Sequence, residues 1–392
     1  MNYDFDTVTD RRSTWSEKWD IKEGELPMWV ADMDFKCAPE IKEAMQERLD
    51  NGIFGYSYVP DEWASSYVNW WRDKHGFTMA KEWFIFSTGV IPSISSIVRK
   101  LTTPAEKVLI TTPVYNIFYN CILNQGRVPV ESPLVVKNGQ YAFDFEDIEK
   151  KLSDPQVSLM LLCNPQNPSG TQWSRDDLKR IGDLCAGYGV TVLSDEIHCD
   201  ICDAGFEYVP FASVSEVNRN ISITCISFTK AFNMAGLQSS AVSVPNPLLR
   251  HKVWRALNTD EVAEPNSFAV TAAIAAFTRG SDWLTAMNAY VTENKRILSD
   301  MLSLEFPEIR PVMGHATYLY WIDVSAITGD KIADDLQAFI RKETGLYIQK
   351  GSVYGPGGEN YLRINLACPR TILTDGIERL RTGLNRYKEV NK

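Results

Sequence analysis

The sequence lacks any apolar run long enough to cross a membrane. A transmembrane helix needs roughly 20 consecutive apolar residues, and no stretch of the 392 residues approaches that length. The N-terminal residues MNYDFDTVTDRR have neither a basic start nor an apolar core, so we expect no secretory signal peptide. Without these features export is not expected, and the predicted location is cytoplasmic.

Clusters of lysine and arginine are also missing. The chain has 40 lysine and arginine residues against 50 aspartate and glutamate residues, which gives a net charge of −10 and a pI of about 5.1. Nucleic-acid binding depends on basic surfaces that neutralise phosphates, so we do not expect a nucleic-acid partner. Any anionic ligand must be held by local donors.

Cysteines are present, but they are not arranged as a metal site. The eight cysteines are scattered, and Cys163 and Cys225 lie in apolar, strand-like segments. This pattern predicts buried free thiols in a reducing compartment. Cys199 and Cys202 form a Cys-x-x-Cys pair beside His198, but no second ligand pair at zinc spacing accompanies them. We therefore predict no metal.

The order of apolar strands and helices predicts an α/β fold. Strands alternating with helices form mostly parallel sheets that are covered on both faces, and ligands gather beyond the carboxyl ends of such strands. The expected strands are 83–87, 107–111, 157–163, 190–194 and 221–227, and the expected helices are 38–50, 61–74, 93–101, 114–125 and 174–186.

After about residue 285 the pattern changes to that of a smaller α+β domain. A long helix is expected at 283–304, followed by strands at 317–324, 346–349 and 361–365 and helices at 331–344 and 374–387. We predict a large domain over residues 50–285. Residues 1–49 and 286–392 are predicted to form the small domain together.

Lys230 occupies an unusual position for a lysine. It lies in the stretch SFTKAFNMAGL (227–237), which follows an apolar run at the expected carboxyl end of a buried strand. Phe228, Ala231 and Phe232 would exclude water, which lowers a lysine pKa and makes the nucleophilic neutral amine accessible. Such an amine suits a Schiff base with an aldehyde such as pyridoxal 5′-phosphate (PLP). The alternative is a lysine whose amine merely extends from the edge of the core.

Polar residues of complementary types follow other predicted strands. Asn167 and Asp195 each come shortly after an apolar strand, and Gly89, Val90 and Ile91 lead into a helix. PLP needs a carboxylate for its pyridine nitrogen, a neutral donor for its ring oxygen, and backbone N–H groups at a helix start for its phosphate. Asp195, Asn167 and the residues 89–91 offer these groups in turn.

Two hydroxyls, those of Ser227 and Thr229, could add donors to the phosphate. Each residue alone has an ordinary alternative, because Asp195 could cap a helix, Asn167 could only form a turn, and Gly89 could only form a tight connection. Their common position after apolar strands favours the cofactor interpretation.

Several spaced motifs together resemble a known enzyme family. The order NPQNPSG, SDEIH and SFTKAFNMAGL resembles the fold-type-I PLP-dependent enzymes of the aspartate aminotransferase superfamily. The segments DRRSTWSEKWD, ADMDF, FGY and RINLACPR resemble its cystathionine β-lyase, or C–S lyase, branch. The resemblance covers residues 10–385. It implies a large domain with a mostly parallel seven-stranded sheet flanked by helices, plus a smaller α+β domain.

The resemblance also implies a role for each matching residue. Lys230 would bind PLP and move the Cα proton of the substrate, Asp195 would pair with the pyridine nitrogen, and Asn167 would bond to the ring oxygen. Tyr115 would stack on the ring. Arg363 would bind the substrate α-carboxylate with its planar fork. The alternatives are plain core packing for Tyr115 and a surface salt bridge for Arg363.

Tyr56, in FGY, would reach the phosphate of a neighbouring subunit, which implies a homodimer with shared sites. Tyr56 and Asn167 would also contact the substrate. Two positions depart from the aminotransferase pattern. His198 stands where aminotransferases usually carry a tyrosine, as in the lyase branch, and would lie near the ring oxygen. Gln238 stands where they tend to carry an arginine for the phosphate, so backbone and hydroxyl donors would hold that group.

The activity implied by the resemblance is that of a PLP-dependent carbon–sulfur β-lyase acting on small amino acids. Such an enzyme converts L-cystathionine or related cysteine S-conjugates to a thiol, pyruvate and ammonia. An aminotransferase that uses an amino acid and a 2-oxo acid is the alternative on the same fold. A regulatory protein that binds another protein is a third possibility, and an exposed apolar patch away from the cofactor would favour it.

Overall fold

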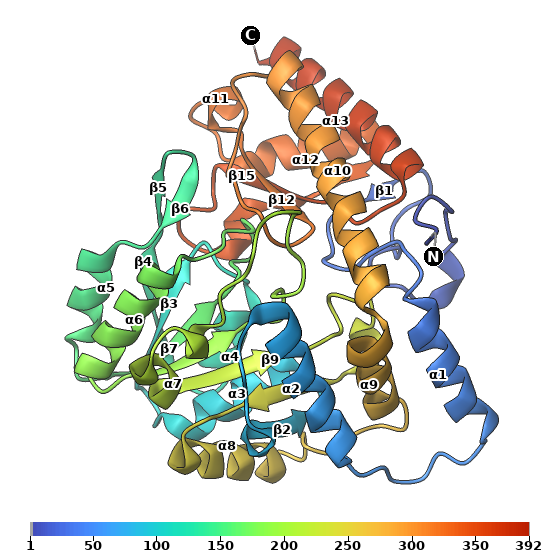
Figure 1. Cartoon of the computed structure of the whole chain (residues 1–392). Helices are drawn as coiled ribbons and strands as arrows, with labels where there is room; N and C mark the ends of the chain where they lie inside the picture. The colour runs from blue at the N-terminus through green and yellow to red at the C-terminus, as the bar shows by residue number, and fades with distance from the viewer. Residues whose placement is uncertain (1–2, 392) are drawn as a thin grey trace.

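A seven-stranded sheet forms the centre of the larger part of the molecule (Figure 1). The computed structural model describes residues 3–391. The strands, in the order in which they pair, are β2 (Phe84–Ser87), β10 (Ser240–Ser243), β9 (Ser222–Ile226), β8 (Thr191–Asp195), β7 (Val157–Cys163), β3 (Lys107–Thr112) and β4 (Val128–Pro133). Strand β10 runs opposite to the other six strands, which are parallel to one another. The prediction of a mostly parallel seven-stranded sheet is confirmed.

Strand β7 shows how both faces of this sheet are covered. Leu159 and Leu161 belong to one hydrophobic cluster, and Met160 and Leu162 belong to another on the opposite face. A strand that is buried on both faces carries a continuous apolar run. The first cluster includes α3 (Val90–Leu101), α4 (Ile117–Leu123) and α8 (Pro247–Thr259), and the second includes α5 (Phe145–Leu152) and α6 (Arg175–Gly187).

The smaller part is built on an antiparallel sheet. Its strands pair in the order β11 (Arg310–Pro311), β12 (Leu319–Asp323), β15 (Tyr361–Asn365) and β14 (Gln349–Lys350). Its helices are α10 (Ser281–Glu305), α11 (Ser325–Thr328), α12 (Ala333–Thr344) and α13 (Arg370–Val390). The N-terminal segment joins it, because β1 (Leu26–Pro27) pairs in parallel with β13 (Leu346–Tyr347).

Helix α1 (Pro39–Asp50) lies away from this small sheet, beside α9 (Ala269–Arg279) (Figure 1). Its Ile41 and Ala44 share a cluster with residues of α9 and of α2 (Asp61–His75). Helix α10 starts in that same cluster with Trp283 and reaches the small-domain cluster with Leu298. The domain bounds 50–285 and 1–49 with 286–392 stay a prediction.

Some elements differ from the expectation. Helix α3 begins at Val90 instead of residue 93, directly after Gly89. The helix expected at 114–125 is shorter, because the Val114 N–H donates to Tyr354 O (2.9 Å) and α4 begins only at Ile117. Strands β4 and β10 of the large sheet and the hairpin β5 (Val135–Lys137) with β6 (Gln140–Ala142) were not predicted. Among residues 3–391, no helix combines the length and apolar character that a membrane crossing requires.

Candidate active site

The residues predicted to bind PLP and substrate meet beyond the carboxyl edge of the large sheet. Strands β7, β8 and β9 are parallel neighbours. Asn167 follows β7, Asp195 is the last residue of β8, and Lys230 follows β9. One cavity of about 390 Å³ lies between these residues and the small domain. The predicted site residues that line it are Val90, Ile91, Tyr115, Asn167, Asp195, His198, Lys230 and Arg363.

The Lys230 amine is held by the N-terminal segment. Its Nζ donates a hydrogen bond to Ala31 O (2.6 Å), and the Tyr318 hydroxyl donates to the same carbonyl (2.9 Å). Burial lowers the pKa of Lys230, the nearby Arg363 lowers it further, and the negative charge of Asp32 opposes the shift. The neutral amine is therefore easier to reach than in a surface lysine.

Asp195 is buried at the end of β8 and has few hydrogen-bond partners. Its carboxylate accepts one hydrogen bond within the described chain, from the Ile197 N–H (3.1 Å). Burial raises the pKa of Asp195 to about 7, while the charge of Lys230 acts in the opposite direction. A carboxylate in such a place favours a positively charged or proton-donating partner, which suits a pyridine nitrogen.

Arg363 enters the cavity from β15 with its guanidinium fixed by two hydrogen bonds. Nη1 donates to Asn167 Oδ1 (3.1 Å) and Nη2 donates to Trp29 O (2.8 Å). The guanidinium also lies 4.9 Å from the centre of the Tyr354 ring. Nε is buried without a partner among the described residues. The side chain is therefore oriented in advance and keeps a donor for an anionic ligand.

Tyr115 and His198 form neutral parts of the wall. Burial raises the pKa of Tyr115 to about 12, and burial lowers the pKa of His198 to about 3, helped by the positive charges of Lys230 and Arg363. His198 Nδ1 is buried and has no hydrogen-bond partner within residues 3–391. A neutral imidazole with a free nitrogen suits a polar atom of a bound ring.

The start of α3 faces the cavity, because Gly89 is the N-cap and Val90 and Ile91 line the wall. A helix N-terminus favours an anion. The Ser227 and Thr229 hydroxyls lie 2.7 Å apart, and Ser227 also donates to Ser239 O (2.6 Å). Neither hydroxyl is part of the cavity wall. Their role toward a phosphate stays a prediction.

Tyr56 lies outside the cavity of its own chain. Its side chain is fully exposed in the loop between α1 and α2. This position neither brings Tyr56 to the site nor tests the prediction that it serves a neighbouring subunit.

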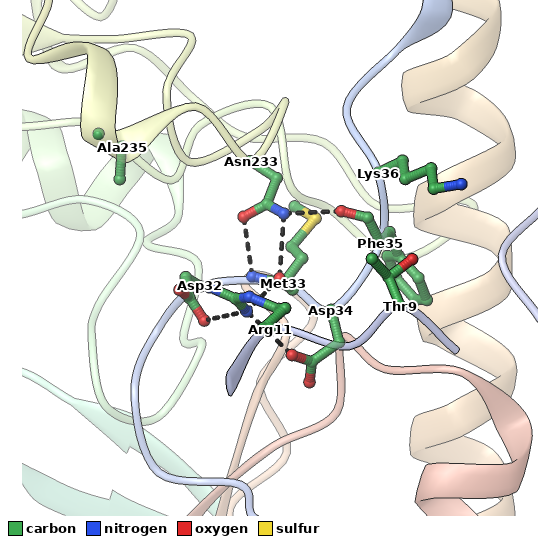
Figure 2. Close-up of a pocket in the computed structure, with 10 residues that line it drawn as sticks. Thr9, Arg11, Asp32, Met33, Asp34, Phe35, Lys36, Asn233 and Ala235 are labelled. Carbon is green, nitrogen blue, oxygen red and sulfur yellow. Dashed lines mark hydrogen bonds and ion pairs between the residues drawn. The ribbon is translucent and has the colours of Figure 1, made fainter. Parts of the chain in front are cut away.

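Two asparagines outside the predicted site residues fix the N-terminal segment over Lys230. Asn233 accepts from the Met33 N–H (3.0 Å) and donates to Met33 O (3.0 Å) and Phe35 O (2.8 Å), as Figure 2 shows. Asn365 donates to Val30 O (2.5 Å) and Asp32 O (2.6 Å). One backbone carbonyl of the ADMDF segment, that of Ala31, thus reaches the lysine, and side-chain motifs do not report such a group.

Charged side chains secure the same segment. Arg11 contacts Asp32 (2.7 Å) and Asp34 (2.9 Å), and Figure 2 shows both interactions. The buried Lys18 amine lies 2.7 Å from the other Asp34 oxygen. Two cations therefore balance two carboxylates beside the cavity.

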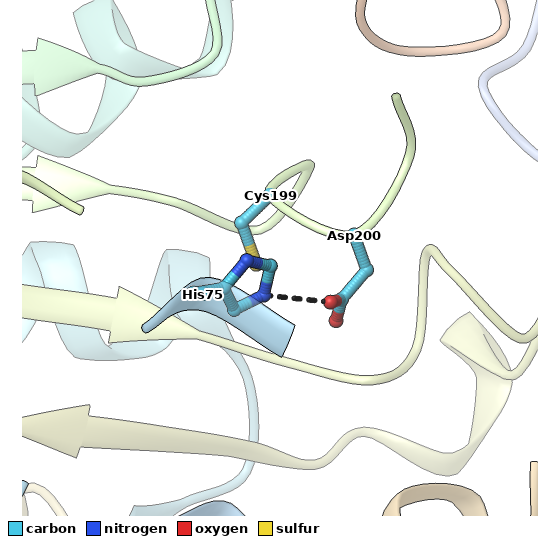
Figure 3. A group of neighbouring side chains, drawn as sticks. All are labelled: His75, Cys199 and Asp200. Carbon is cyan, nitrogen blue, oxygen red and sulfur yellow. Dashed lines mark hydrogen bonds and ion pairs between the residues drawn. The ribbon is translucent and has the colours of Figure 1, made fainter. Parts of the chain in front are cut away.

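A second polar cluster, shown in Figure 3, contains His75, Cys199 and Asp200. Their potential ligand atoms lie within 4.8 Å of one another. Asp200 Oδ1 is within hydrogen-bond distance of His75 Nε2 (2.9 Å) and accepts from Trp70 Nε1 (2.8 Å). These contacts tie the end of α2 to the turn after β8, which explains the cluster as a tether between the two elements.

Comparisons with known proteins agree with this geometry. A family model described as aminotransferase class I and II matches residues 26–380. The chain belongs to the aminotransferase class I and II family. Cystathionine beta-lyase PatB of Bacillus subtilis is 42% identical over 97% of this chain and 100% of its own length. Protein MalY of Escherichia coli is 33% identical over 96% of this chain and 97% of its own.

The fold has close counterparts among solved structures. The PLP-bound C-S lyase from Staphylococcus hominis superposes with a TM-score of 0.92 at 33% identity, covering 98% of each chain. The predicted fold type I architecture is thereby confirmed. The cavity also fits PLP chemically. The buried Asp195 carboxylate would be stabilised by a cationic partner such as a protonated pyridine nitrogen. His198 Nδ1 and Arg363 Nε are buried polar atoms without hydrogen-bond partners in the described chain. A bound polar ligand would remove the cost of leaving such atoms unsatisfied.

Proposed function

We propose that this protein is a PLP-dependent carbon–sulfur β-lyase that acts on L-cystathionine or related cysteine S-conjugates. The observation that carries the proposal is the placement of one amine, Lys230, and one oriented guanidinium, Arg363, on the same cavity. The full-length similarity to a protein named cystathionine beta-lyase supports it. The substrates are small amino acids with a sulfur at Cβ.

Some of the cavity residues bind the cofactor, and others bind the substrate. Lys230 would hold PLP through its amine, Asp195 would pair with the pyridine nitrogen, Asn167 would bind the ring oxygen, Tyr115 would pack on the ring, and the start of α3 would bind the phosphate. When bound, PLP supplies an electron sink for negative charge at the substrate Cα. Arg363 binds the substrate α-carboxylate and so aims the Cα proton at Lys230.

Lys230 acts as the base, since burial favours its neutral form. Its Nζ takes the Cα proton, the C–S bond breaks, and the electron pair leaves with the sulfur, which gains a proton to become a thiol. The three-carbon fragment takes up water and releases pyruvate and ammonia. For L-cystathionine the thiol is homocysteine.

The fold also supports amino transfer, in which the amino group passes to a 2-oxo acid. The family to which the chain belongs includes aminotransferases by its description. The two activities differ in one requirement, because elimination needs no 2-oxo acid and releases ammonia.

We also infer that the working unit is a homodimer in which Tyr56 reaches the partner's site. The loop that carries Tyr56 also exposes Ile53, Phe54 and Tyr58, and apolar side chains gathered on one loop are typical of a protein interface. The eight free cysteines support a reducing, cytoplasmic location.

The test uses purified protein with added PLP, L-cystathionine and no 2-oxo acid, and assays thiol, pyruvate and ammonia together. Equal amounts of the three products are expected. Lys230→Ala should release none, whereas the exposed Lys252→Ala should behave as the parent protein. Absence of product until a 2-oxo acid is supplied, with amino transfer thereafter, would replace this proposal with the aminotransferase.

A further inference from the structure

The charges that line the active-site cavity do not all have partners. The ionised residues of the wall are Glu17, Asp32, Asp195, Lys230 and Arg363. Asp32 is paired with Arg11 (2.7 Å). Under the proposed function, PLP takes Lys230 and Asp195, and the substrate α-carboxylate takes Arg363. The single charge left over is the Glu17 carboxylate.

The Glu17 carboxylate is accessible to a ligand. Its side chain is exposed at the cavity edge, and no hydrogen bond or ion pair joins it to another residue in the part of the chain that the structure describes. The next residue, Lys18, is buried and turned toward Asp34. The Glu17 charge does reach the site, since it opposes the fall in the pKa of Lys230 that burial causes.

No other residue of the wall cancels this charge. Besides Lys230 and Arg363 the cavity wall carries no lysine or arginine. Gln349, another polar residue of the wall, is neutral. The amino and carboxylate groups of a substrate are bound deep in the cavity, by the cofactor and Arg363. We therefore expect the substituent on the far side of the sulfur to extend toward the exposed edge, where Glu17 lies.

We propose that Glu17 is a specificity-determining residue that favours thioether amino acids with a cationic group beyond the sulfur. The inference rests on the proposed function and specifies its substrate class. An uncompensated carboxylate attracts an ammonium and repels a carboxylate. S-(2-aminoethyl)-L-cysteine carries only such an ammonium beyond the sulfur, whereas L-cystathionine carries an ammonium together with a carboxylate there.

The test compares two substrates of similar shape that differ in charge. S-(2-aminoethyl)-L-cysteine ends in an ammonium, and S-propyl-L-cysteine ends in a methyl group. The readout is the ratio of kcat/KM for the cationic substrate to kcat/KM for the neutral one, measured on the PLP-loaded protein. Glu17→Gln should lower this ratio by up to about fivefold, the range of an exposed ion pair. Glu17→Lys should lower it further.

Two controls make the result specific. Asp20→Asn removes the same charge from an exposed position on the same segment, outside the cavity wall, and should leave the ratio unchanged. Raising the salt concentration should shrink the effect of Glu17→Gln, because exposed charges are screened.

The outcomes separate this inference from the proposed function. If the parent protein releases thiol from both substrates and Glu17→Gln leaves the ratio at the parent value, the role of Glu17 is wrong and the lyase proposal stands. If the parent protein releases thiol from neither these substrates nor L-cystathionine, both proposals fall.

Discussion

Arg363 and Asn167, which lie 196 residues apart in the sequence, are joined by a hydrogen bond of 3.1 Å. Arg363 comes from the small antiparallel sheet, and Asn167 follows β7 of the large sheet. This hydrogen bond therefore fixes the distance between the proposed binding site for the substrate carboxylate and that for the cofactor ring oxygen.

Replacing Arg363 with lysine tests this arrangement. A lysine keeps the charge but loses the planar fork, so both the contact with Asn167 and the aim at a carboxylate should be lost. Charge-assisted hydrogen bonds contribute about 1.5–3 kcal/mol, so kcat/KM should fall by roughly tenfold to 100-fold, mainly through KM. Steady-state kinetics with L-cystathionine measure the change. The exposed Arg386→Lys is the matched control, and an unchanged KM in Arg363→Lys would contradict the assignment.

Asp195 should make the stability of the cofactor-free protein fall as pH rises. Burial raises its pKa from the usual 3.8 to about 7, so the folded state binds more protons than the unfolded state between these pH values. Stability then decreases with rising pH. An asparagine side chain cannot ionise, so Asp195→Asn should match the parent protein near pH 4 and exceed its unfolding free energy by up to about 4 kcal/mol above pH 7.

Urea unfolding of both cofactor-free proteins from pH 4 to pH 8 measures this difference. Asp20→Asn, an exposed substitution of the same kind, should show no such pH-dependent gap. Adding PLP should stabilise the parent protein more than Asp195→Asn, because only the carboxylate pairs with the pyridine nitrogen. Parallel curves for parent and variant at every pH would refute the raised pKa.

Asn365 should matter for both stability and substrate binding. Asn365→Ala leaves the partly buried carbonyls of Val30 and Asp32 and the buried Ala367 N–H without their partner, and an unsatisfied buried group costs about 1–3 kcal/mol. We expect a loss of about 3 kcal/mol in unfolding free energy and a higher KM, because the segment over the active-site lysine loosens. Denaturant unfolding and kinetics measure the two effects, with the exposed Asn385→Ala as control.

Tyr56 separates a role in the dimer from a role within one chain. If its hydroxyl reaches the phosphate of the partner subunit, Tyr56→Phe should weaken PLP binding by about tenfold or more while the protein stays dimeric. Equilibrium dialysis measures the affinity, and light scattering measures the mass against 44.4 kDa per chain. The exposed Tyr188→Phe serves as control. The shared site would be ruled out if the parent protein is monomeric and if Tyr56→Phe binds PLP with the same affinity as the parent protein.

The fold was predictable where the sequence carries strong apolar runs. Strand β7 was found with its bounds because its seven residues are nearly all apolar, as burial on both faces requires. Strand β10 was missed because Ser240–Ser243 is short and half serine, so its position between β2 and β9 is set by pairing and not by local pattern.

The site was predictable where chemistry depends on side chains. Lys230, Asp195 and Asn167 lie at or after the ends of their strands and meet at one cavity. The carbonyl of Ala31 could not be predicted as the acceptor for Lys230, because a backbone group has no sequence signature. Its position results from contacts that Asn233 and Asn365 make across about 200 and 330 residues of chain, which only the folded structure brings together.

The stretch from β1 to α1 makes four kinds of contact along one short length of backbone. It pairs with β13 in a separate two-stranded sheet, its Trp29 carbonyl orients Arg363, its Ala31 carbonyl holds Lys230, and it continues into the helix that packs on α9. A shift of the small antiparallel sheet would therefore move the surroundings of the Arg363 guanidinium and of the Lys230 amine together. A substitution that moves this stretch would therefore alter carboxylate binding and lysine reactivity together, whereas a substitution at the cavity edge can alter substrate preference alone.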